Sequence, residues 1–371
     1  MAFQSTNYFG GLDGLRAVSI LLVILHHTAH WNSNLLSTLQ HNGRYGVSFF
    51  FVISGFLICT LFLREQKKTG KIDLWKFYGR RAVRLLPLYY ALLIVQAILI
   101  FGLHQYTPAN QEMFRANLPS YLFYYSNWLP TSGQGPFFCA WSLAVEEQFY
   151  LTFGLLIVFA TRKQVIIAAL AALVLKICIY QLLGPIDTNS TVWRVVFSYE
   201  EAILIGVLTA FILNTQHGYE SFAKLLRSPW VLTGVGAATA CWLLFQPIRP
   251  ESSWWEQLLY VLMALVLAGI VIRPRTPVLG GKVLAYVGRI SYGMYLFHMF
   301  VICCVEKIPG GSSPWLSFPL SVSLTVLAAA LSYQYFEYPI MNKWKQRLSP
   351  LNQSSVPPAR FPGTKEVNPV A

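Results

Sequence analysis

The chain has 371 residues, of which 55% are hydrophobic and only 12% charged, and its net charge is +13. Soluble domains carry roughly twice that share of charged residues, so the composition excludes a soluble globular protein and makes lipid the solvent for most of the chain. The basic excess indicates anionic lipid headgroups and phosphorylated substrates as partners. Nucleic acid is excluded because no recognition motif accompanies the charge.

Ten apolar stretches, each about as long as a membrane-spanning helix, follow one another along the chain. They lie near residues 12–30, 45–63, 86–103, 142–160, 164–183, 198–213, 229–246, 256–272, 286–305 and 317–337. The sequence therefore predicts an all-α fold, a polytopic transmembrane bundle of about ten helices. Residues 1–345 are expected to form one membrane domain, and the Pro-rich, polar residues 346–371 a disordered cytoplasmic tail.

Basic residues alternate between the connections as the positive-inside rule requires of a multi-pass protein. The connections after the second, fourth, sixth, eighth and tenth stretches carry clusters of Lys and Arg, whereas each opposite connection carries a single basic residue. This pattern predicts that both termini are cytoplasmic. The long opposite connection contains "SYLFYYSNWLP", which is expected to form a short interfacial or re-entrant helix.

The first apolar stretch carries ionisable groups that are costly inside a membrane. At about 100° per residue, His27 returns to within about 20° of the helix face of Arg16. Asp13 falls near the same stripe, whereas His26 points about 80° away. We expect Asp13, Arg16 and His27 to line one interior face. Two structural interpretations stay open: interfacial snorkelling of Arg16 and a hydrogen-bonded structural role for His27.

Two further motifs carry charge at the edge of an apolar stretch. In "FYGRRAVRLLP", Arg81 and Arg84 share a helix face, and guanidinium groups bind phosphate well, although positive-inside anchoring also explains them. In "WSLAVEEQFYL", Ser142 and Glu146 face together, and Glu147 is rotated by about 100°. Two adjacent carboxylates that enter a membrane segment favour a functional role.

Depth in the membrane separates these groups. A rise of about 1.5 Å per residue places His27, Ser142, Glu146 and His298 in the outer half and the arginines at the inner face, about 20 Å away. A reaction that joins the two levels needs a long, flexible donor such as a phosphopantetheine arm. No group of Cys and His has metal-ligand spacing, so no metal is expected.

Five motifs, in this order, resemble those of the acyltransferase 3 family of polytopic membrane acyltransferases. They are "LDGLRA" with Arg16 and His27 spaced as R-x10-H, "GVSFFFVISGFLI" at 46–58, the R-x-x-R of Arg81 and Arg84, "WSLAVEEQFYL" at 141–151 and "GRISYGMYLFH" at 288–298. With "FEYP" at Glu337, the resemblance covers nearly the whole chain.

The resemblance implies O-acylation, often acetylation, of carbohydrate-type acceptors at a bacterial inner membrane. It also implies that His27 is the essential catalytic histidine and that Arg16, Arg81 and Arg84 serve the acyl-CoA donor. Where relatives often have Asp after the "GV" pair, this chain has Ser48, so no carboxylate role is assigned there. The chain shows no SGNH-type esterase domain, and no relay to a second domain within it is expected.

Together, the residues and the resemblance predict a membrane O-acyltransferase that uses cytoplasmic acyl-CoA, most often acetyl-CoA, as co-substrate. No bound cofactor is expected, and the acceptor is a hydroxyl of a carbohydrate or glycolipid at the outer side. His27 is the expected general base, and Glu146 tunes it or contacts the acceptor. The supporting residues of the acceptor pocket are expected to be Asp13, Trp141, Ser142, Glu147 and His298, with Trp141 stacking on a sugar ring.

Two alternatives stay open at this point. One is a covalent acyl-histidine intermediate in place of direct transfer. The other is a transporter or flippase of a lipid-linked or anionic solute, in which the same charged stripe lines a path. No inverted repeat and no paired broken helices in the sequence support the transporter.

Overall fold

The computed structural model describes residues 10–129, 135–183, 190–246, 254–273 and 279–348. Within these ranges the secondary structure is helical, without strands. The α-helices are α2 (Gly10–His27), α3 (Asn34–Asn42), α4 (Tyr45–Thr69), α5 (Leu74–Ala97), α6 (Pro108–Leu122), α7 (Ala140–Phe159), α8 (Arg162–Leu183), α9 (Thr191–Val196), α10 (Glu201–Leu213), α11 (Gln216–Leu226), α12 (Pro229–Phe245), α13 (Trp254–Ile272), α14 (Lys282–Val305), α15 (Pro314–Ser332) and α16 (Tyr338–Leu348).

The predicted all-α bundle is confirmed, and each of the ten predicted stretches lies mainly in a helix. Among the described residues, eight helical segments are long and apolar enough to cross a membrane, or nine if α11 and α12, which are bent by 84°, form one span. The helix α2, with two charged residues and two histidines, is not among the eight. The predicted tail 346–371 lies outside the described residues except for 346–348, which continue α16.

Capping side chains and prolines explain where several helices begin. Asp73 caps α5 by accepting a hydrogen bond from the Lys76 amide at 2.9 Å, and Pro108, Pro229 and Pro314 stand in the first turns of α6, α12 and α15. The predicted interfacial segment in "SYLFYYSNWLP" is divided between the end of α6 and a single 3₁₀ turn, Ser126–Trp128.

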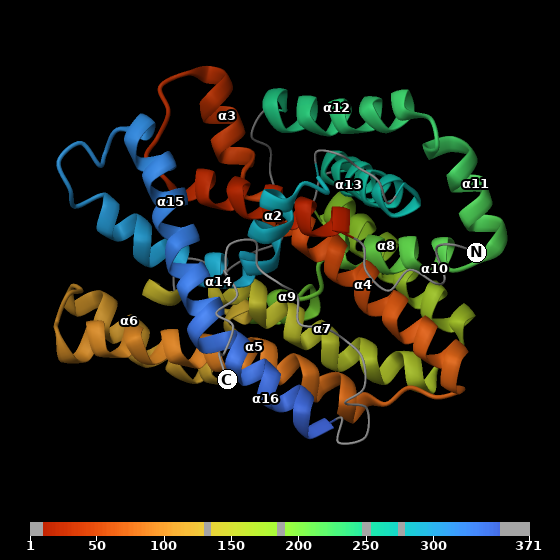
Figure 1. Cartoon of the computed structure of the whole chain (residues 1–371), viewed down its shortest axis with the longest axis horizontal. Coiled ribbons are helices and arrows are strands. Elements are labelled where there is room, and N and C mark those ends of the chain that lie inside the picture. The colour runs from red at the N-terminus through yellow and green to blue at the C-terminus, as the bar shows by residue number, and fades with distance from the viewer. Residues whose placement is uncertain (1–9, 130–134, 184–189, 247–253, 274–278, 349–371) are drawn as a thin grey trace, which may run out of the picture.

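Helix α2 lies near the middle of the bundle, in contact with α3, α4, α13, α14 and α15 (Figure 1). Glycines allow its backbone to touch its neighbours. A β-carbon at Gly288 of α14 would overlap the Asp13 carbonyl, and one at Gly46 of α4 would overlap the Ser19 carbonyl. Without a hydrophobic force between helices in lipid, such close contacts supply much of the packing energy. They fix the position of α2.

Two hydrophobic clusters flank α2 and α7, and both helices contribute to both. Leu12 and Leu15 belong to a cluster built largely from α4, α10 and α13, whereas Ile20 and Ile24 belong to one built from α5, α6, α14 and α15. The buried residues of α7 are likewise divided between the two clusters. The polar residues of α2 and α7 are therefore held at the junction between two packed units.

We predict that Gly288→Ala destabilises the protein, because the new methyl group must push α14 away from α2. Overpacking of this kind costs about 1–3 kcal/mol. Thermal unfolding of the purified protein in one detergent measures the effect as a lowered Tm. Gly236→Ala on α12 is the matched control, since a β-carbon there meets no atom within 4 Å. Equal Tm values for the two variants would contradict the role given to Gly288.

Candidate active site

A cavity of about 260 Å³ lies at the junction of α2, α4, α5, α7 and α14. Its polar lining residues come from five helices: Arg16, Ser54, Arg80, Arg81, Arg84, Ser142, Glu146, Tyr150, Ser291, Tyr292 and Tyr295. Its apolar wall includes Val47, Phe50 and Phe51. The cavity thus brings together motifs that are far apart in the sequence.

Guanidinium groups dominate the charge of this cavity. Arg16 forms an ion pair of 2.9 Å with Asp13, while the Arg81 guanidinium lies over the Tyr150 ring, 3.7 Å from its centroid. Within the described residues neither Arg81 nor Arg84 forms an ion pair with a carboxylate. Cations without carboxylate partners in a cavity wall make it suitable for a phosphate-bearing ligand.

Helix α7 presents one of its two adjacent glutamates to the cavity. Glu146 accepts a hydrogen bond of 2.6 Å from the Ser54 hydroxyl of α4, and Tyr150 donates to that hydroxyl at 3.4 Å. Glu147 is not among the lining residues, which fits its predicted rotation away from Ser142 and Glu146. Ser54 and Tyr150 lie inside two of the motifs quoted above, "GVSFFFVISGFLI" and "WSLAVEEQFYL", but no role was predicted for either side chain.

A hydrogen-bonded pair closes part of the cavity wall between α7 and α14. The Ser142 and Tyr295 hydroxyls share a hydrogen bond of 2.6 Å, and the Cys139 carbonyl lies within hydrogen-bond distance of both, 3.4 Å from Ser142 and 3.1 Å from Tyr295. Behind this pair, the Tyr295 and His298 rings lie 5.4 Å apart. Tyr295 was missed in the sequence analysis, although its place three residues before His298 puts both on one helix face.

The histidine of α14 is fully buried beside the end of α2. The Nδ1 atom of His298 bonds the Tyr295 carbonyl, which only accepts, so the proton lies on Nδ1 and Nε2 carries a lone pair. Within the described residues that Nε2 has no hydrogen-bond partner. The His27 ring lies 5.3 Å from the His298 ring, so the structure pairs the two histidines.

His27 itself lies beyond the cavity wall and is not among the cavity's lining residues. It is the last residue of α2, and its ring also contacts Phe138 at 5.5 Å and His26 at 4.8 Å between centroids. Arg16 therefore lines the cavity and His27 does not, although we expected both on one interior face of the helix. Tyr295 links the two regions, since it lines the cavity and its ring lies 5.4 Å from the His298 ring.

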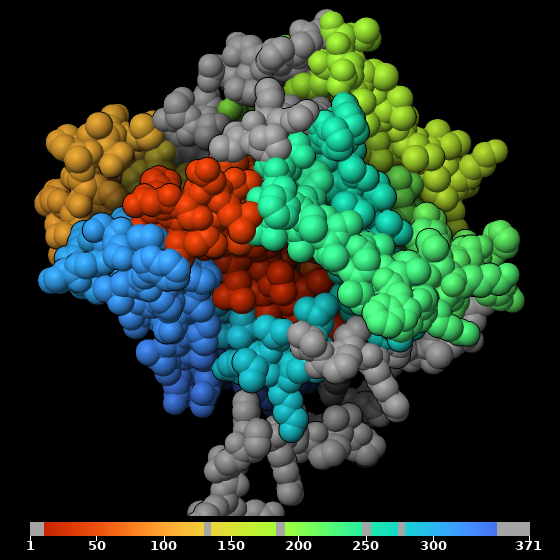
Figure 2. All heavy atoms as spheres, turned by 90° about the horizontal axis from the view of Figure 1, so that it is seen from above, coloured from red at the N-terminus to blue at the C-terminus, as the bar shows by residue number. Residues whose placement is uncertain are grey.

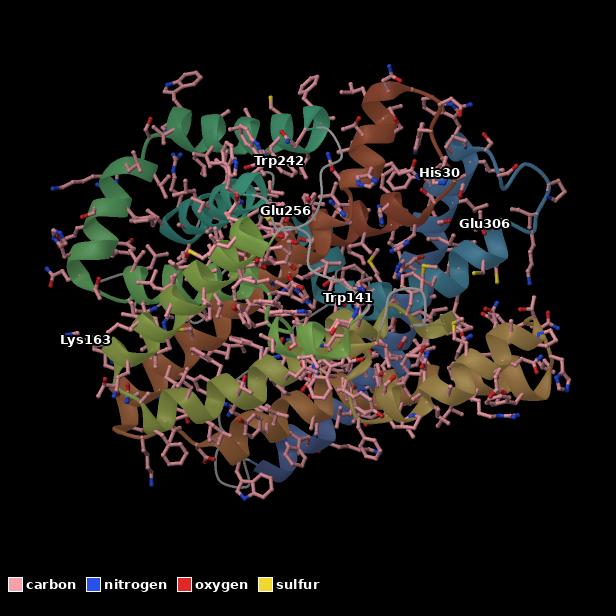
Figure 3. The ribbon with its side chains drawn as sticks, turned by 180° about the vertical axis from the view of Figure 1, so that it is seen from behind. His30, Trp141, Lys163, Trp242, Glu256 and Glu306 are labelled. Atoms are coloured by element: carbon pink, nitrogen blue, oxygen red, sulfur yellow. The ribbon has the colours of Figure 1, made fainter. Side chains whose placement is uncertain are left out.

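Two other predicted site residues have mainly packing or pairing contacts. The Trp141 indole packs edge-on against Phe51, 6.1 Å between centroids, and does not line the cavity; Figure 3 shows it inside the bundle. Asp13 is nearly buried and pairs with Arg16. Within the described residues no three His, Cys, Asp or Glu side chains gather to hold a metal ion.

Comparison with known proteins identifies relatives of this chain. Residues 9–334 match the family described as acyltransferase domain. The chain is similar to the O-acetyltransferase OatA of Staphylococcus aureus strain NCTC 8325, with 30% identity over 91% of this chain and 58% of that protein. It is also similar to a putative O-acetyltransferase of strain MRSA252, with 31% identity over 95% of this chain and 60% of that protein.

The chain thus spans about 58% of the length of the first of these relatives and 60% of the second. No solved structure matches the chain.

We predict that Ser54→Ala lowers the free energy of unfolding, because it removes the hydrogen bond to Glu146. The loss is expected to be about 1–3 kcal/mol, as for a bond to a charged group. Ser323→Ala is the control, since that hydroxyl bonds only its own helix, on an exposed face. Unfolding in denaturant at matched detergent concentration measures both. A Ser54→Ala protein as stable as Ser323→Ala would contradict the interaction.

Proposed function

The chain belongs to the acyltransferase 3 family, and from that premise we propose that it moves an acetyl group from cytoplasmic acetyl-CoA to a hydroxyl of a carbohydrate acceptor at the outer side of the membrane. It is an integral, multi-pass membrane protein with an acyltransferase domain. The observation that carries the proposal is one cavity whose wall joins an arginine cluster to the Ser142–Tyr295 pair, directly in front of two histidines.

The arginines supply the donor site in this proposal. Coenzyme A carries phosphates at one end and the thioester at the other, so a cluster of guanidinium groups at one part of the cavity holds the donor by its phosphates. Arg81 and Arg84 suit this role because neither forms an ion pair with a carboxylate of the described residues. Arg16, paired with Asp13, lies on the helix that leads to His27.

The apolar wall of the cavity suits the reacting thioester. Phe50 and Phe51 give an apolar lining, and a volume of about 260 Å³ is small, which favours a short acyl group over a long chain. The hydroxyls of Ser142 and Tyr295 are the donors that stabilise negative charge on the thioester carbonyl oxygen during attack. Both hydroxyls become available when their mutual hydrogen bond and the bond to the Cys139 carbonyl break, at a net cost of about 1 kcal/mol for each bond.

His27 acts as the general base in this mechanism. Its imidazole removes the proton of the acceptor hydroxyl, whose oxygen forms the new ester bond as the carbon–sulfur bond breaks. The coenzyme A thiolate then takes up the proton. His298, with its proton on Nδ1, has an Nε2 lone pair without a partner beside His27, and in the proposed reaction this lone pair accepts a hydrogen bond from the His27 ring. Glu146 lies in the same cavity and balances the arginine charge.

We predict that His27→Ala lowers the rate of transfer from labelled acetyl-CoA about 10²- to 10⁴-fold, the usual contribution of a general base. The exposed His217 on α11 provides the control, and His217→Ala is expected to keep the wild-type rate. Normal transfer by His27→Ala would remove this mechanism. Movement of a solute without thioester consumption by the wild type would favour a transporter instead.

We predict that Arg84→Ala raises the KM for acetyl-CoA about tenfold or more, since a charge-assisted hydrogen bond contributes about 1.5–3 kcal/mol. The KM for S-acetylpantetheine, which lacks the phosphates, should not change. Arg227→Ala, an exposed arginine of a connection with the same predicted orientation, is the matched control. An equal rise for both donors would show that Arg84 does not recognise phosphate.

A further inference from the structure

A second cavity, of about 650 Å³, lies past the C-terminal end of α2. One side is formed by residues 30–33 and Leu36 of α3, and the other by residues 312–315 at the start of α15. Figure 3 shows His30 in this region, beside α3 and α15, and Figure 2 shows α3 on one face of the molecule between α15 and α12. Nothing in the sequence analysis assigns a role to this cavity.

The two cavities lie toward opposite ends of α2, and His27 lies between them along the helix. Arg16 lines the first cavity, and His30, three residues past His27, lines the second. The eleven residues from Arg16 to His27 span about 16 Å at the helical rise. In the predicted topology the second cavity therefore opens on the outer side, where an acceptor arrives.

The lining of the second cavity contains polar groups but no carboxylate, lysine or arginine. It contains the hydroxyls of Ser33, Ser312 and Ser313 and the amide of Asn32, and none of its lining residues is Asp, Glu, Lys or Arg. The first cavity, by contrast, contains four arginines. A neutral lining of hydroxyl and amide groups does not select phosphate or other anions, and it matches a ligand with many hydroxyl groups.

Two indoles form an aromatic wall of this cavity. The Trp31 and Trp315 rings meet edge to face, 4.7 Å between centroids, and Trp315 stays 73% exposed. A broad aromatic face beside hydrogen-bonding groups accommodates the C–H face of a pyranose ring while its hydroxyls bond the serines. The indole N–H of Trp31 is buried and has no hydrogen-bond partner among the described residues.

One buried side chain ties this wall to the end of α2. The Gln40 amide, 4% exposed, donates to the Thr28 carbonyl at 2.7 Å, and its oxygen accepts from the Trp31 amide at 3.2 Å. The Gln40 carbonyl also bonds the His26 ring at 3.0 Å. The segment that carries Trp31 is therefore fixed relative to the last turn of α2, which carries His27.

We propose that the second cavity is the acceptor site and binds a neutral pyranose ring between Trp31, Trp315 and the three serines. This inference rests on the proposed function, because it supplies the hydroxyl that His27 deprotonates. The uncharged lining distinguishes the sugar from an anionic lipid headgroup, and the cavity replaces Trp141 as the place where a sugar ring stacks.

Tryptophan footprinting tests the site without catalysis. Wild-type protein in detergent is oxidised with and without a neutral oligosaccharide (cellotetraose, maltotetraose or chitotetraose), and the oxidised residues are mapped by mass spectrometry. Trp315 is expected to be protected several-fold by at least one of them. Trp254, exposed and stacked on Trp255, should not be protected. Protection by a phosphocholine detergent but by none of the sugars would assign the cavity to lipid and overturn the proposal.

Kinetics with the protecting sugar provide the second test. Trp315→Ala should raise the KM for the sugar about tenfold, the factor expected for one lost aromatic contact, and Trp315→Phe should restore most of the affinity. Trp254→Ala should behave as wild type. Equal losses in the Ala and Phe variants would contradict stacking at this position.

The two proposals fail in different ways. If a sugar is acetylated but does not protect Trp315, the proposed acceptor site is wrong and the proposed acetyltransferase activity stands. Protection of Trp315 without any consumption of acetyl-CoA overturns the proposed function and leaves a carbohydrate-binding cavity. If none of the three sugars protects Trp315 and none receives an acetyl group, both proposals are contradicted.

Discussion

The contact of α2 with α14 and α4 is the constraint on which the site depends. Gly288 and Gly46 let neighbouring backbones meet α2 at the carbonyls of Asp13 and Ser19. This contact positions the polar side chains of α2, because a helix packed rigidly against two neighbours cannot rotate about its own axis. Arg16 is thereby directed into the first cavity, while His27 is brought beside His298 of α14. The same approach recurs between α4 and α10, where a β-carbon at Gly55 would overlap the Ile203 carbonyl.

Charge is distributed unequally over the two cavities. The first combines four arginines with Glu146, whereas the second has no formally charged lining residue. In the proposed reaction this difference sorts the substrates before any chemistry occurs, since a phosphorylated donor and a neutral acceptor prefer different environments. Two of the histidines near the end of α2 bond the backbone rather than acids: His298 bonds the Tyr295 carbonyl and His26 the Gln40 carbonyl.

The sequence predicts the helices well because lipid enforces them: a segment without internal backbone hydrogen bonds does not cross a bilayer, so apolar length is a strong signal. Helical periodicity also predicts that Ser142 and Glu146 share a face and that Glu147 does not, as the cavity shows. Periodicity cannot tell which neighbour covers a face. Trp141 meets Phe51, and the pairing of α11 with α12 at 84° depends on tertiary contacts.

The other features of the site that the sequence did not predict also depend on contacts between helices. The alignment of His27 with Arg16 along α2 is a property of one helix, but the cavity that Arg16 lines also takes residues from α7 and α14, and no local pattern encodes the bond between Ser142 and Tyr295 that joins these two helices. Tyr295 and Ser54 look like ordinary members of apolar runs, and only their partners, Ser142 and Glu146, give them importance. The Trp31–Trp315 contact joins residues near opposite ends of the chain.

The bond between Ser142 and Tyr295 has a consequence for the membrane as a barrier. A continuous aqueous channel through the bundle would let protons and ions leak down their gradients. In the proposed reaction, this closed pair keeps the inner and outer spaces separate while each fills with its own substrate. An opening only as wide as one side-chain pair would admit an acetyl group and exclude hydrated ions, so the proposed transfer would not discharge the membrane potential.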